Sequence, residues 1–407
     1  MRVLFVNTYY YPNMFGGAEH SVKLLASNFS KKYPCAIFSV DASTKGLQKE
    51  TIDGVEIFRS GSSFFDFKAR FTKNESLHCK IKNRLSDLYN PAASRHFRKV
   101  LDEFKPDIIH TNGLRGIGPQ VWRIAQERGI KVVHTLRDYY AADPLMREKP
   151  PSNVFILLWR YFWNKKSSFL DVVTAPSLFT VEKMLKYGFA RNKPFRSIPN
   201  AIPFEENVFL ANIAYSKKLQ RKRTRFLFAG ALVKFKGILN LIDAFEILQK
   251  KADVELVVCG AGELSEYVKR AAENNNSIYF RGKISSDALK TEYLEADVCV
   301  IPSLWEEPFG RVVVEAAYNG CALIASNRGG IPEIIQELKA GILCDCSNVE
   351  QLAGAMYDLC DRKKRFAQLD VFTNTVAFFS ETNNTSSFNF LYKELFENSV
   401  ILNPQKA

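Results

Sequence analysis

Two carboxylates, Glu307 and Glu315, have the spacing in this sequence that points most directly to chemistry. They stand eight positions apart (315 minus 307) in the segment EEPFGRVVVEA. A Pro-Phe-Gly turn at 308–310 separates them, and the apolar run after it predicts a helix. One use of such a pair is an acid and a base that flank a single bond. The other is a clamp on an elongated ligand, in which the carboxylates accept from hydroxyls at both ends and the N–H groups of 310–312 hold a phosphate. The intervening turn favours the clamp, and therefore a nucleotide sugar.

Two lysines follow the apolar run at 225–230, which predicts a strand. Lys234 and Lys236 stand just past Gly230, where a segment with helical periodicity begins at 236–250. Cations beside the N–H groups of a helix start favour a diphosphate site. Solvated surface lysines are the alternative, but the order strand, glycine, loop, lysine, glycine favours a function.

Glycines mark two further loops. Gly16-Gly17 precede a helix predicted from Ala18, whose first N–H groups can hold an anion, and a tight turn with positive φ is equally open. Gly260-Ala-Gly262 follows another apolar run and resembles a dinucleotide fingerprint, which requires an acidic residue about 20 positions later. The next strand ends in Phe-Arg281-Gly instead, so dinucleotide binding is not favoured.

Histidines and charged residues follow predicted strands in the first half of the chain. His110 closes the run at 106–111, and Asn112 comes after it. His134 lies inside an apolar run, so we expect a core residue with its hydrogen bonds satisfied. Arg137 and Asp138 come directly after that run, where side chains can reach a cleft.

Short apolar runs alternate with helix-period segments from end to end. This alternation is typical of parallel sheets that are covered on both faces, and two such series predict two doubly wound α/β domains. The polar stretch SKKLQRKRT ends at Thr224 and predicts a linker, and the spacing at 388–400 predicts a final amphipathic helix. The predicted strands lie at 2–7, 35–40, 55–60, 106–111, 131–136, 171–176, 225–230, 254–260, 277–282, 297–303, 322–326 and 341–345.

Composition bounds the class of protein. With 407 residues, 46% hydrophobic and 24% charged, the chain is expected to be soluble and to form two domains of roughly 200 residues. The eight cysteines include no C-x-x-C pair and are expected to be reduced and buried. The net charge of +13 predicts an anionic partner, but no nucleic-acid motif is present. The N-terminus lacks the apolar core of a signal peptide, so we expect a cytoplasmic protein.

These residues together resemble the retaining glycosyltransferases of the GT-B fold, in family 4 of the usual classification. The resemblance covers nearly the whole chain, and its most specific part is the Glu-x7-Glu element. The matching motifs are GGAE (16–19), PDIIHTNG (106–113), TAPSLFT (174–180), SIPNAI (197–202), AGALVKFKG (229–237), VCGAGE (258–263), YFRG (279–282), ADVCVIPS (296–303), EEPFGRVVVEAAYNG (306–320) and GGIPEII (329–335).

The resemblance implies an α/β, GT-B architecture: two Rossmann-like domains facing across a cleft, with a C-terminal helix that crosses back to the first domain. The implied division is an acceptor domain at 1–203, a nucleotide-sugar domain at 204–378 with a linker at 204–224, and the returning helix at 379–407.

Site roles are also implied by the resemblance. Glu307 would hold donor-sugar hydroxyls, Glu315 the ribose, Lys236 the pyrophosphate, and Arg281 would line the base pocket. The implied catalytic residues are Glu307, Lys236, Arg137 and Asp138. The implied donor-binding residues are Gly16, Gly17, Gly230, Lys234, Lys236, Gly260, Arg281, Glu307, Phe309, Gly310, Arg311, Val312 and Glu315. His110 and Asn112 are implied on the acceptor side.

The implied reaction needs neither a cofactor nor a metal. A nucleotide-diphosphate sugar is the co-substrate, with a UDP-sugar favoured over a GDP-sugar, and its diphosphate leaves as the acceptor hydroxyl attacks from the same face. Two positions depart from the family pattern. Ala231 stands where an Arg is usual, and Arg137 stands where many relatives have His. Lys234 can replace the first cation but lacks its planar fork, and Arg137 is left open between the leaving phosphate and an acceptor phosphate.

The acceptor is expected to be a glycan or a lipid-linked saccharide of cell-surface polysaccharide or glycolipid synthesis. The segment at 59–105 carries eleven Lys and Arg against five Asp and Glu, interleaved with phenylalanines. There, contact with an anionic membrane surface and a solvated loop are equally open. For the aromatic segment at 153–169, we prefer a buried helix over membrane docking. Two other functions stay open: a GT-B epimerase or phosphorylase, and a nucleotide-sugar-binding protein without activity.

Overall fold

The computed structural model describes residues 1–14, 16–41, 43–61, 77–145, 153–203, 222–366 and 371–402. By its contacts the chain forms two units, which we call unit 1 and unit 2. Unit 1 comprises Met1–Ala201 with Glu381–Ala407, and unit 2 comprises Ile202–Ser380. Most of the predicted linker at 204–224 lies outside the described residues.

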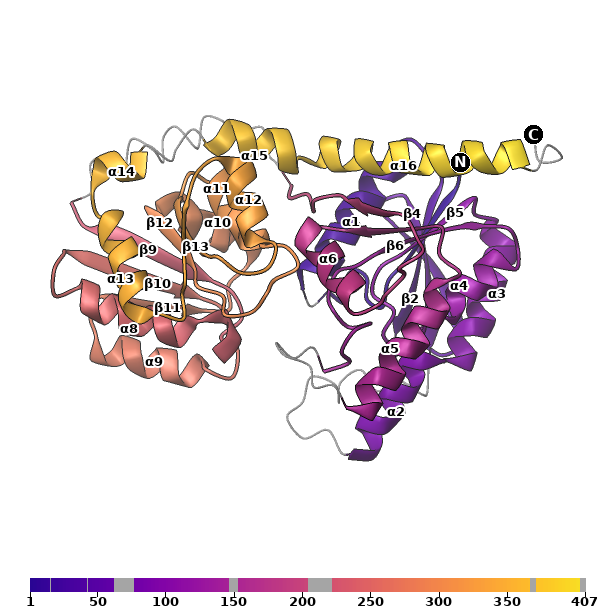
Figure 1. Cartoon of the computed structure of the whole chain (residues 1–407), viewed down its shortest axis with the longest axis horizontal. Coiled ribbons are helices and arrows are strands. Elements are labelled where there is room, and N and C mark those ends of the chain that lie inside the picture. Colours follow the sequence, from indigo (N-terminus) through magenta and orange to yellow (C-terminus); the bar gives the residue numbers. More distant parts are fainter. Residues whose placement is uncertain are drawn as a thin grey trace. The chain divides into compact units, whose positions relative to one another are not determined.

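Unit 1 is built on an eight-stranded sheet in the order β3-β4-β2-β1-β5-β6-β7-β8 (Figure 1). The order reverses at β1, because β2 lies on one side of it and β5 on the other. Ligands of such sheets bind at the carboxyl ends of the strands beside this switch point. The strands are β1 (Val3–Val6), β2 (Cys35–Asp41), β3 (Leu47–Ile52), β4 (Val55–Gly61), β5 (Ile108–Thr111), β6 (Lys131–Thr135), β7 (Val172–Ala175) and β8 (Phe195–Ser197).

Two strands of this sheet were not among the predicted elements. β3 pairs antiparallel with β4 at the sheet edge, and four of its six residues are exposed. Its sequence LQKETI therefore lacks the apolar run by which buried parallel strands are found. β8 has three residues, too few to show a pattern.

The helices of unit 1 include one that comes from the far end of the sequence. Helix α16 packs on α1, and its Phe388, Leu391 and Tyr392 join the same buried core as Phe5 and Phe29 (Figure 1). The helices are α1 (Gly17–Ser30), α2 (Leu77–Leu88), α3 (Pro91–Phe104), α4 (Gln120–Gln126), α5 (Val154–Ser167), α6 (Leu178–Lys186) and α16 (Glu381–Leu402).

Helix α5 corrects a sequence-based expectation. The segment at 153–169 was expected to be a buried helix, but only one face is buried, with Ile156, Trp159 and Trp163. Apolar residues occur on more than one face of the helix, whereas α4 is its main helical neighbour and covers a single side. The other face remains in contact with solvent.

Unit 2 is built on a six-stranded, wholly parallel sheet in the order β11-β10-β9-β12-β13-β14. Successive residues of β9 alternate between two cores: Phe226 and Phe228 face one, Leu227 and Ala229 the other. This double burial explains the near-continuous apolar runs. The strands are β9 (Thr224–Ala229), β10 (Val254–Cys259), β11 (Ile278–Gly282), β12 (Val298–Ile301), β13 (Ala322–Ser326) and β14 (Ile342–Cys344).

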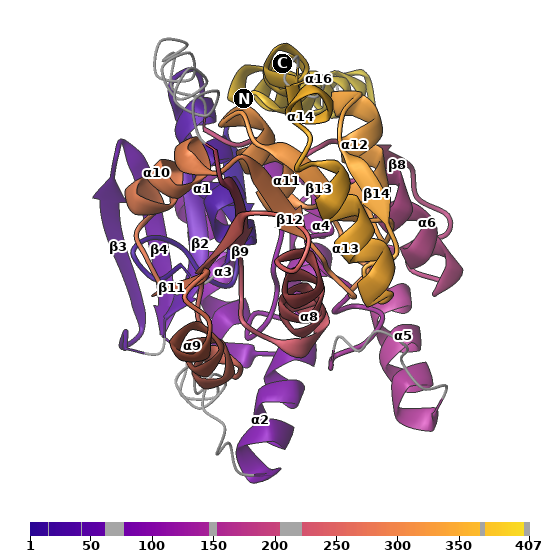
Figure 2. The same ribbon diagram turned by 90° about the vertical axis from the view of Figure 1, so that its left-hand side faces the viewer.

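Helices cover both faces of this sheet. Figure 2 shows α8, α9 and α13 on one face and α10, α11 and α12 on the other. The two sheets confirm the predicted α/β class with two Rossmann-like folds. The helices are η2 (Lys234–Lys236), α8 (Ile238–Leu248), α9 (Ser265–Asn274), α10 (Ser286–Glu295), α11 (Arg311–Tyr318), α12 (Ile331–Leu338), α13 (Val349–Asp358), α14 (Arg362–Phe366) and α15 (Val371–Phe379).

Candidate active site

An ion pair joins two loops at the carboxyl edge of the unit 2 sheet. Nζ of Lys236, on the short helix after β9, lies 2.8 Å from Oε1 of Glu307, on the loop after β12. Both side chains are partly buried, with 27% and 17% of their surface exposed. Nearby, the N–H of Leu304 donates to the carbonyl of Phe235 at 2.8 Å, which fixes the two loops against each other. The sequence predicted both residues for the donor site, but not that they pair.

Glycines allow this close approach of the loops. Gly237 has φ of +73°, and a Cβ added there would lie 1.8 Å from the carbonyl oxygen of Pro302. Gly260 brings the loop after β10 against the loop after β9, because its added Cβ would lie 1.8 Å from the carbonyl oxygen of Gly230. A side chain at either position would separate the loops. Three loops, after β9, β10 and β12, therefore meet at the switch point of the sheet.

Helix α11 carries the second carboxylate of the clamp. Gly310 precedes the helix, and Glu315 is its fifth residue, as the spacing predicted. Oε1 of Glu315 accepts from Nε of Arg311 at 2.6 Å, and Oε2 accepts from the Tyr293 hydroxyl at 3.2 Å. Burial, and next the charge of Glu315, raise the pKa of Tyr293 well above its ordinary value, so Tyr293 stays a neutral donor. Any ribose hydroxyl at Glu315 would share the carboxylate with these two groups.

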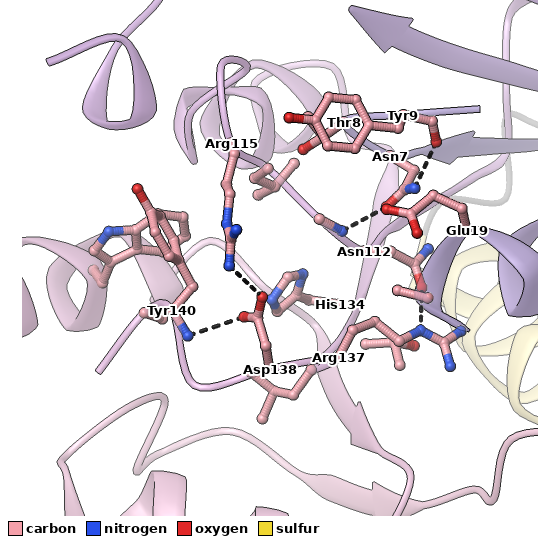
Figure 3. A pocket seen from close by; sticks show the side chains of 17 residues that line it. Asn7, Thr8, Tyr9, Glu19, Asn112, Arg115, His134, Arg137, Asp138 and Tyr140 are labelled. Carbon is pink, nitrogen blue, oxygen red and sulfur yellow. Dashed lines mark hydrogen bonds and ion pairs between the residues drawn. The ribbon is translucent and has the colours of Figure 1, made fainter. Parts of the chain in front are cut away.

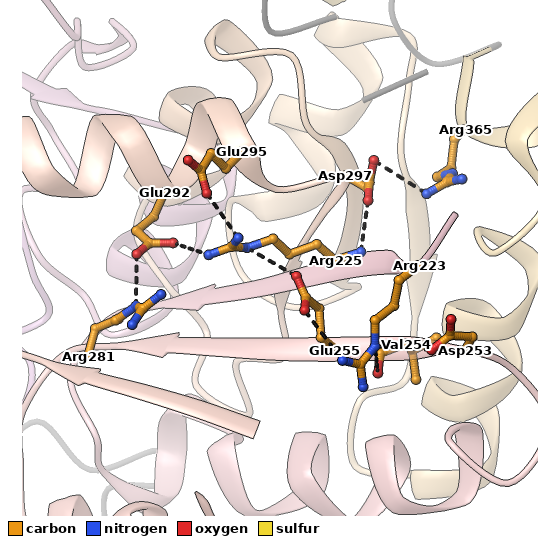
Figure 4. Close-up of polar contacts among 10 residues, drawn as sticks. All are labelled: Arg223, Arg225, Asp253, Val254, Glu255, Arg281, Glu292, Glu295, Asp297 and Arg365. Carbon is orange, nitrogen blue, oxygen red and sulfur yellow. Dashed lines mark hydrogen bonds and ion pairs between the residues drawn. The ribbon is translucent and has the colours of Figure 1, made fainter. Parts of the chain in front are cut away.

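Arg281, predicted for the base pocket, belongs to a network of ion pairs (Figure 4). Its Nε lies 3.0 Å from Oε1 of Glu292, whose other oxygen lies 2.8 Å from Nη2 of Arg225. Arg225 also pairs with Glu255 and Glu295, which ties α10 to the strands. The side chain of Arg281 is still 45% exposed, so its outer edge is accessible to a ligand.

Unit 1 contains a pocket of about 110 Å³ at the carboxyl ends of β1, β5 and β6 (Figure 3). It lies where the strand order reverses, as expected for a ligand site of this architecture. Asn112, Arg137 and Asp138 line it, so three of the residues predicted for this half of the chain come together. The complete lining is Asn7, Thr8, Tyr9, Ala18, Glu19, Asn112, Gly113, Leu114, Arg115, His134, Thr135, Leu136, Arg137, Asp138, Tyr140, Ala141 and Trp163.

Asp138 is held firmly at the wall of this pocket (Figure 3). Its Oδ2 lies 2.7 Å from Nη2 of Arg115, and its Oδ1 accepts from the N–H of Tyr140 at 2.9 Å. The guanidinium of Arg115 also lies over the Tyr140 ring, 4.4 Å from its centroid. With both oxygens engaged, Asp138 positions Arg115 more readily than it removes a proton from a substrate.

Arg137 is a partly buried cation with amide partners. Its Nε donates to Oδ1 of Asn112 at 2.9 Å, and Nη1 donates to Oδ1 of Asn200. Within the described ranges no carboxylate comes within ion-pair distance of it. Burial lowers the pKa of Arg137 to about 10, which still leaves it charged at neutral pH.

The two strand histidines are placed differently from their predictions. His110 is fully buried and does not line the pocket; its two ring nitrogens share hydrogen bonds with the hydroxyls of Tyr392 and Thr135. This burial corrects its assignment to the acceptor side. His134 is buried, with Nδ1 hydrogen-bonded to Thr111 at 2.9 Å, as expected for a core residue, yet it also borders the pocket. Burial lowers the pKa of both rings, to about 3 for His134.

The start of α1 shows why Gly16-Gly17 stand there. Neither glycine has positive φ, so the tight-turn alternative is wrong. The N–H of Gly16 instead donates to Oε2 of Glu19 at 2.9 Å, which is one half of a capping box, because glycine has no side chain to make the other bond. One N–H at this helix start is therefore already used by a carboxylate. Burial raises the pKa of Glu19, whose side chain lies at the pocket.

Several pocket residues were not assigned from the sequence. Glu19 was quoted only as part of the GGAE motif, and Arg115 and Thr8 carried no signal of their own. Within the described structure, Oγ1 of Thr8 and Nδ2 of Asn112 are buried polar atoms without a hydrogen-bond partner. These two pocket-lining residues therefore retain unused hydrogen-bonding capacity.

Metal chemistry has no obvious location in the part of the chain that the structure describes. There, no three His, Cys, Asp or Glu side chains come together as metal ligands would. Cys344 and Cys346 are buried with their sulfurs 3.6 Å apart, but no third ligand group joins them.

Comparisons with known proteins show to which family the chain belongs. Residues 15–206 match the model described as Glycosyltransferase Family 4, and residues 212–370 match Glycosyl transferases group 1. The chain belongs to the glycosyltransferase family that these two models together describe. The matches meet near the boundary of the two units, so each unit corresponds to one family model.

Relatives of this glycosyltransferase include a protein of a cps region and a mannosyltransferase. An uncharacterized 42.6 kDa protein in the cps region of Klebsiella pneumoniae is 29% identical over 92% of this chain and 98% of its own. A GDP-mannose-dependent alpha-(1-6)-phosphatidylinositol monomannoside mannosyltransferase of Mycobacterium tuberculosis is 31% identical over 48% of this chain and 54% of its own.

Solved structures confirm the GT-B fold of the glycosyltransferase. Sucrose-phosphate synthase from Thermosynechococcus elongatus is similar with a TM-score of 0.74 at 20% identity, covering 98% of this chain and 99% of its own. HepE from Anabaena, solved in complex with UDP, is similar with a TM-score of 0.67 at 17% identity, covering 97% and 100%.

Proposed function

We propose that this glycosyltransferase moves a sugar from a nucleotide-diphosphate sugar to an acceptor hydroxyl, with retention of configuration. The observation that carries the donor assignment is the Lys236–Glu307 ion pair at 2.8 Å, at the switch point of unit 2. A diphosphate would take Lys236 and the N–H groups at the start of α11, while Glu307 accepts from sugar hydroxyls and Glu315 from the ribose. The donor thus exchanges one ion pair for another, which keeps the lysine charge compensated in both states.

The chemistry proposed for these residues is positioning and charge stabilisation. As the bond between the anomeric carbon and the phosphate oxygen breaks, negative charge grows on the diphosphate, and Lys236 with the helix N–H groups stabilises it. This supply of fixed positive charge supports a reaction without a bound metal. A UDP-sugar is the favoured donor because a structural neighbour was solved in complex with UDP. A GDP-sugar is the second candidate, because one relative is GDP-mannose-dependent.

The acceptor is proposed to bind in the unit 1 pocket. Thr8 and Asn112 offer unpaired buried hydrogen-bonding atoms, and Glu19 adds a carboxylate acceptor, as a saccharide with several hydroxyls requires. Arg137, which donates to Asn112, adds a positive charge to the pocket. Synthesis of a cell-surface polysaccharide or glycolipid is the proposed setting, supported by the relative from a cps region and by the phosphatidylinositol mannoside enzyme.

A thermal-shift screen against UDP-, GDP-, ADP- and dTDP-sugars tests the donor site. One class of nucleotide sugar is expected to stabilise the wild type. Glu307→Gln should bind that donor about tenfold to hundredfold more weakly, because the variant loses a charge-assisted hydrogen bond. Glu306→Gln, one position earlier, is the matched control and should bind as the wild type does. Stabilisation by none of the four classes, or equal affinity of Glu307→Gln and the control, would overturn the donor assignment.

Product analysis with the stabilising donor separates the activities. A glycosyltransferase releases nucleoside diphosphate, slowly by hydrolysis or faster with an acceptor. A free epimerised sugar seen by NMR without acceptor would indicate an epimerase instead. Binding of donor with neither transfer nor hydrolysis would indicate a binding protein.

A further inference from the structure

Helix α5 presents an apolar stripe to solvent on the outer side of unit 1. Val154, Leu157, Leu158 and Tyr161 follow the spacing i, i+3, i+4, i+7, which places them on one face of the helix. Their exposed fractions are 73%, 52%, 62% and 64%. Single exposed apolar residues are ordinary, but four in one row are not. We call these four residues the α5 stripe.

The opposite face of α5 fixes the direction of the stripe. Trp159 and Trp163 are buried beneath the helix, and the indole Nε1 of Trp159 donates to the carbonyl of Tyr140 at 3.0 Å. Arg160 donates to the carbonyl of Ala142 at 2.9 Å. Because these anchors hold α5 from inside, the helix cannot rotate to bury the stripe. Figure 1 shows α5 at the periphery of unit 1.

The charge of α5 selects among possible partners. The helix contains no acidic residue and three cations, Arg160, Lys165 and Lys166. Lys165 is exposed, lies eleven positions after Val154 and so continues the face of the stripe. Among the described residues it forms no ion pair. An apolar row that ends in uncompensated lysine is complementary to a surface with apolar chains beneath anionic headgroups.

The shape of the surface favours lipid over a folded protein. The stripe runs along the convex face of a single helix, whereas a protein partner requires a groove to receive such a ridge or a broad flat patch. Acyl chains conform to a ridge without a prepared groove. Among the helices that the structure describes, none has the length and apolar composition to cross a bilayer, so this contact would be interfacial.

We propose that the α5 stripe and Lys165 dock the protein on a bilayer that carries anionic lipids, with Leu157 and Leu158 inserted between the headgroups. The inner face of the same helix contributes Trp163 to the unit 1 pocket. Docking would therefore place that pocket about one helix diameter, roughly 10 Å, from the lipid surface. Under the proposed function, this distance suits an acceptor whose saccharide is linked to a lipid; the docking itself does not depend on that function.

Co-sedimentation of the full-length protein with vesicles tests the docking. Vesicles of phosphatidylcholine with about one-third phosphatidylglycerol should bind the wild type more tightly than phosphatidylcholine alone, and added salt should weaken the binding. The double variant Leu157→Ser/Leu158→Ser should bind at least about tenfold more weakly, because it loses two inserted side chains. Lys165→Glu should weaken binding to anionic vesicles about fivefold or more and leave binding to neutral vesicles unchanged.

Matched controls keep the outcome decisive. Tyr267→Ser/Tyr357→Ser removes two exposed apolar side chains from unit 2 and should bind vesicles as the wild type does. All these positions are exposed, so the thermal transitions should be unchanged; the donor-induced thermal shift should also persist in every variant, which separates docking from the donor site. Equal vesicle binding by the stripe variant and the control would overturn the proposal. So would concentration-dependent self-association that the stripe variant abolishes, because the stripe would then be an interface between two copies.

A fluorescent reporter gives an independent readout. Tyr161→Trp places an indole on the exposed face, where its emission should shift to the blue on anionic vesicles and be quenched by brominated lipid more than that of the wild type. Emission that stays unchanged while the protein sediments with the vesicles would show that another surface makes the contact, and would overturn the proposal.

Discussion

Glu307 and Lys236 show what a residue type can and cannot reveal. Their proposed chemistry, a carboxylate that accepts from hydroxyls and a cation that binds phosphates, rests on the motifs that contain them. Their pairing at 2.8 Å could not be predicted from those motifs, because 71 positions separate the two residues in the sequence. His110 shows the opposite error. It follows a strand as a site residue would, yet its ring is fully enclosed by Tyr392 and Thr135.

His134 supplies a prediction at this scale. Its pKa is about 3 in the folded protein and near 6.5 in the unfolded chain, so the unfolded chain binds more protons between these values. The contribution of this ring to the free energy of unfolding is therefore complete above pH 6.5. It falls by about 1.4 kcal/mol per pH unit as the pH drops from 6.5 toward 3. His134→Gln should lower the pH dependence of the free energy of unfolding by that amount.

Urea unfolding between pH 6.5 and 4.5 measures this slope. Tryptophan emission reports mainly on unit 1, because three of the four tryptophans lie there. Trp122 meets His134 edge-on, with ring centroids 4.9 Å apart. His110, also buried with a lowered pKa, acts in the same direction and leaves part of the slope in the variant. His20→Gln, at an exposed position, is the control. An unchanged slope in His134→Gln would contradict the prediction.

At the scale of elements, the loops after β9, β10 and β12 meet at the proposed donor site. Alternating apolar and amphipathic segments predicted parallel sheets, in which the loops after the strands gather at one edge. Which of those loops meet was not predicted. The closeness of the loops was not predictable. It depends on Gly237 and Gly260, which in the sequence look like ordinary turn residues.

Gly237→Ala tests how much the close approach contributes. Its Cβ would lie 1.8 Å from the carbonyl oxygen of Pro302, in addition to the strain at φ of +73°. Gly282→Ala is the matched control, with φ of +66° and nothing within 4 Å of the added Cβ. The control should lose about 1 kcal/mol of unfolding free energy, and Gly237→Ala at least about 2 kcal/mol more.

Urea unfolding of both variants gives the comparison, and the donor-induced thermal shift should fall in Gly237→Ala alone. Equal losses of stability in the two variants would mean that only backbone strain matters. The contact with Pro302 would then have no part in holding the Lys236 loop.

At the scale of the whole molecule, the chain passes from unit 2 back to unit 1 at its end. Residues 202–380 form unit 2, and α16 then completes the core of unit 1. The sequence predicted an amphipathic helix at 388–400, and the family resemblance implied its destination. The contacts of Phe388 and Tyr392 with His110 and Phe29 came only from the structure.

Tyr392→Phe tests how much the docking of α16 stabilises unit 1, because it removes a single oxygen atom. The hydroxyl of Tyr392 is hydrogen-bonded to Nδ1 of His110, and its loss would leave a buried polar nitrogen unpaired. The free energy of unfolding of unit 1 should fall by about 1–3 kcal/mol, measured by urea unfolding with tryptophan emission. Tyr89→Phe, at a position of unit 1 that is 54% exposed, should change it by less than about 0.5 kcal/mol. Equal stability of the two variants would show that the hydrogen bond is not needed.

The sequence by itself predicted the class of fold, a division into two units, and the residue types of the proposed donor clamp. Each of these rests on short-range patterns: apolar runs that alternate with helical periods, and motifs that keep strand, turn and helix in consecutive residues. Only the tertiary structure decided which side chains pair, that His110 belongs to the core, that Glu19, Arg115 and Thr8 join the unit 1 pocket, and that α5 leaves one apolar face uncovered. These facts depend on how segments far apart in the chain pack, and on which face of an element finds a neighbour. No local pattern contains that information.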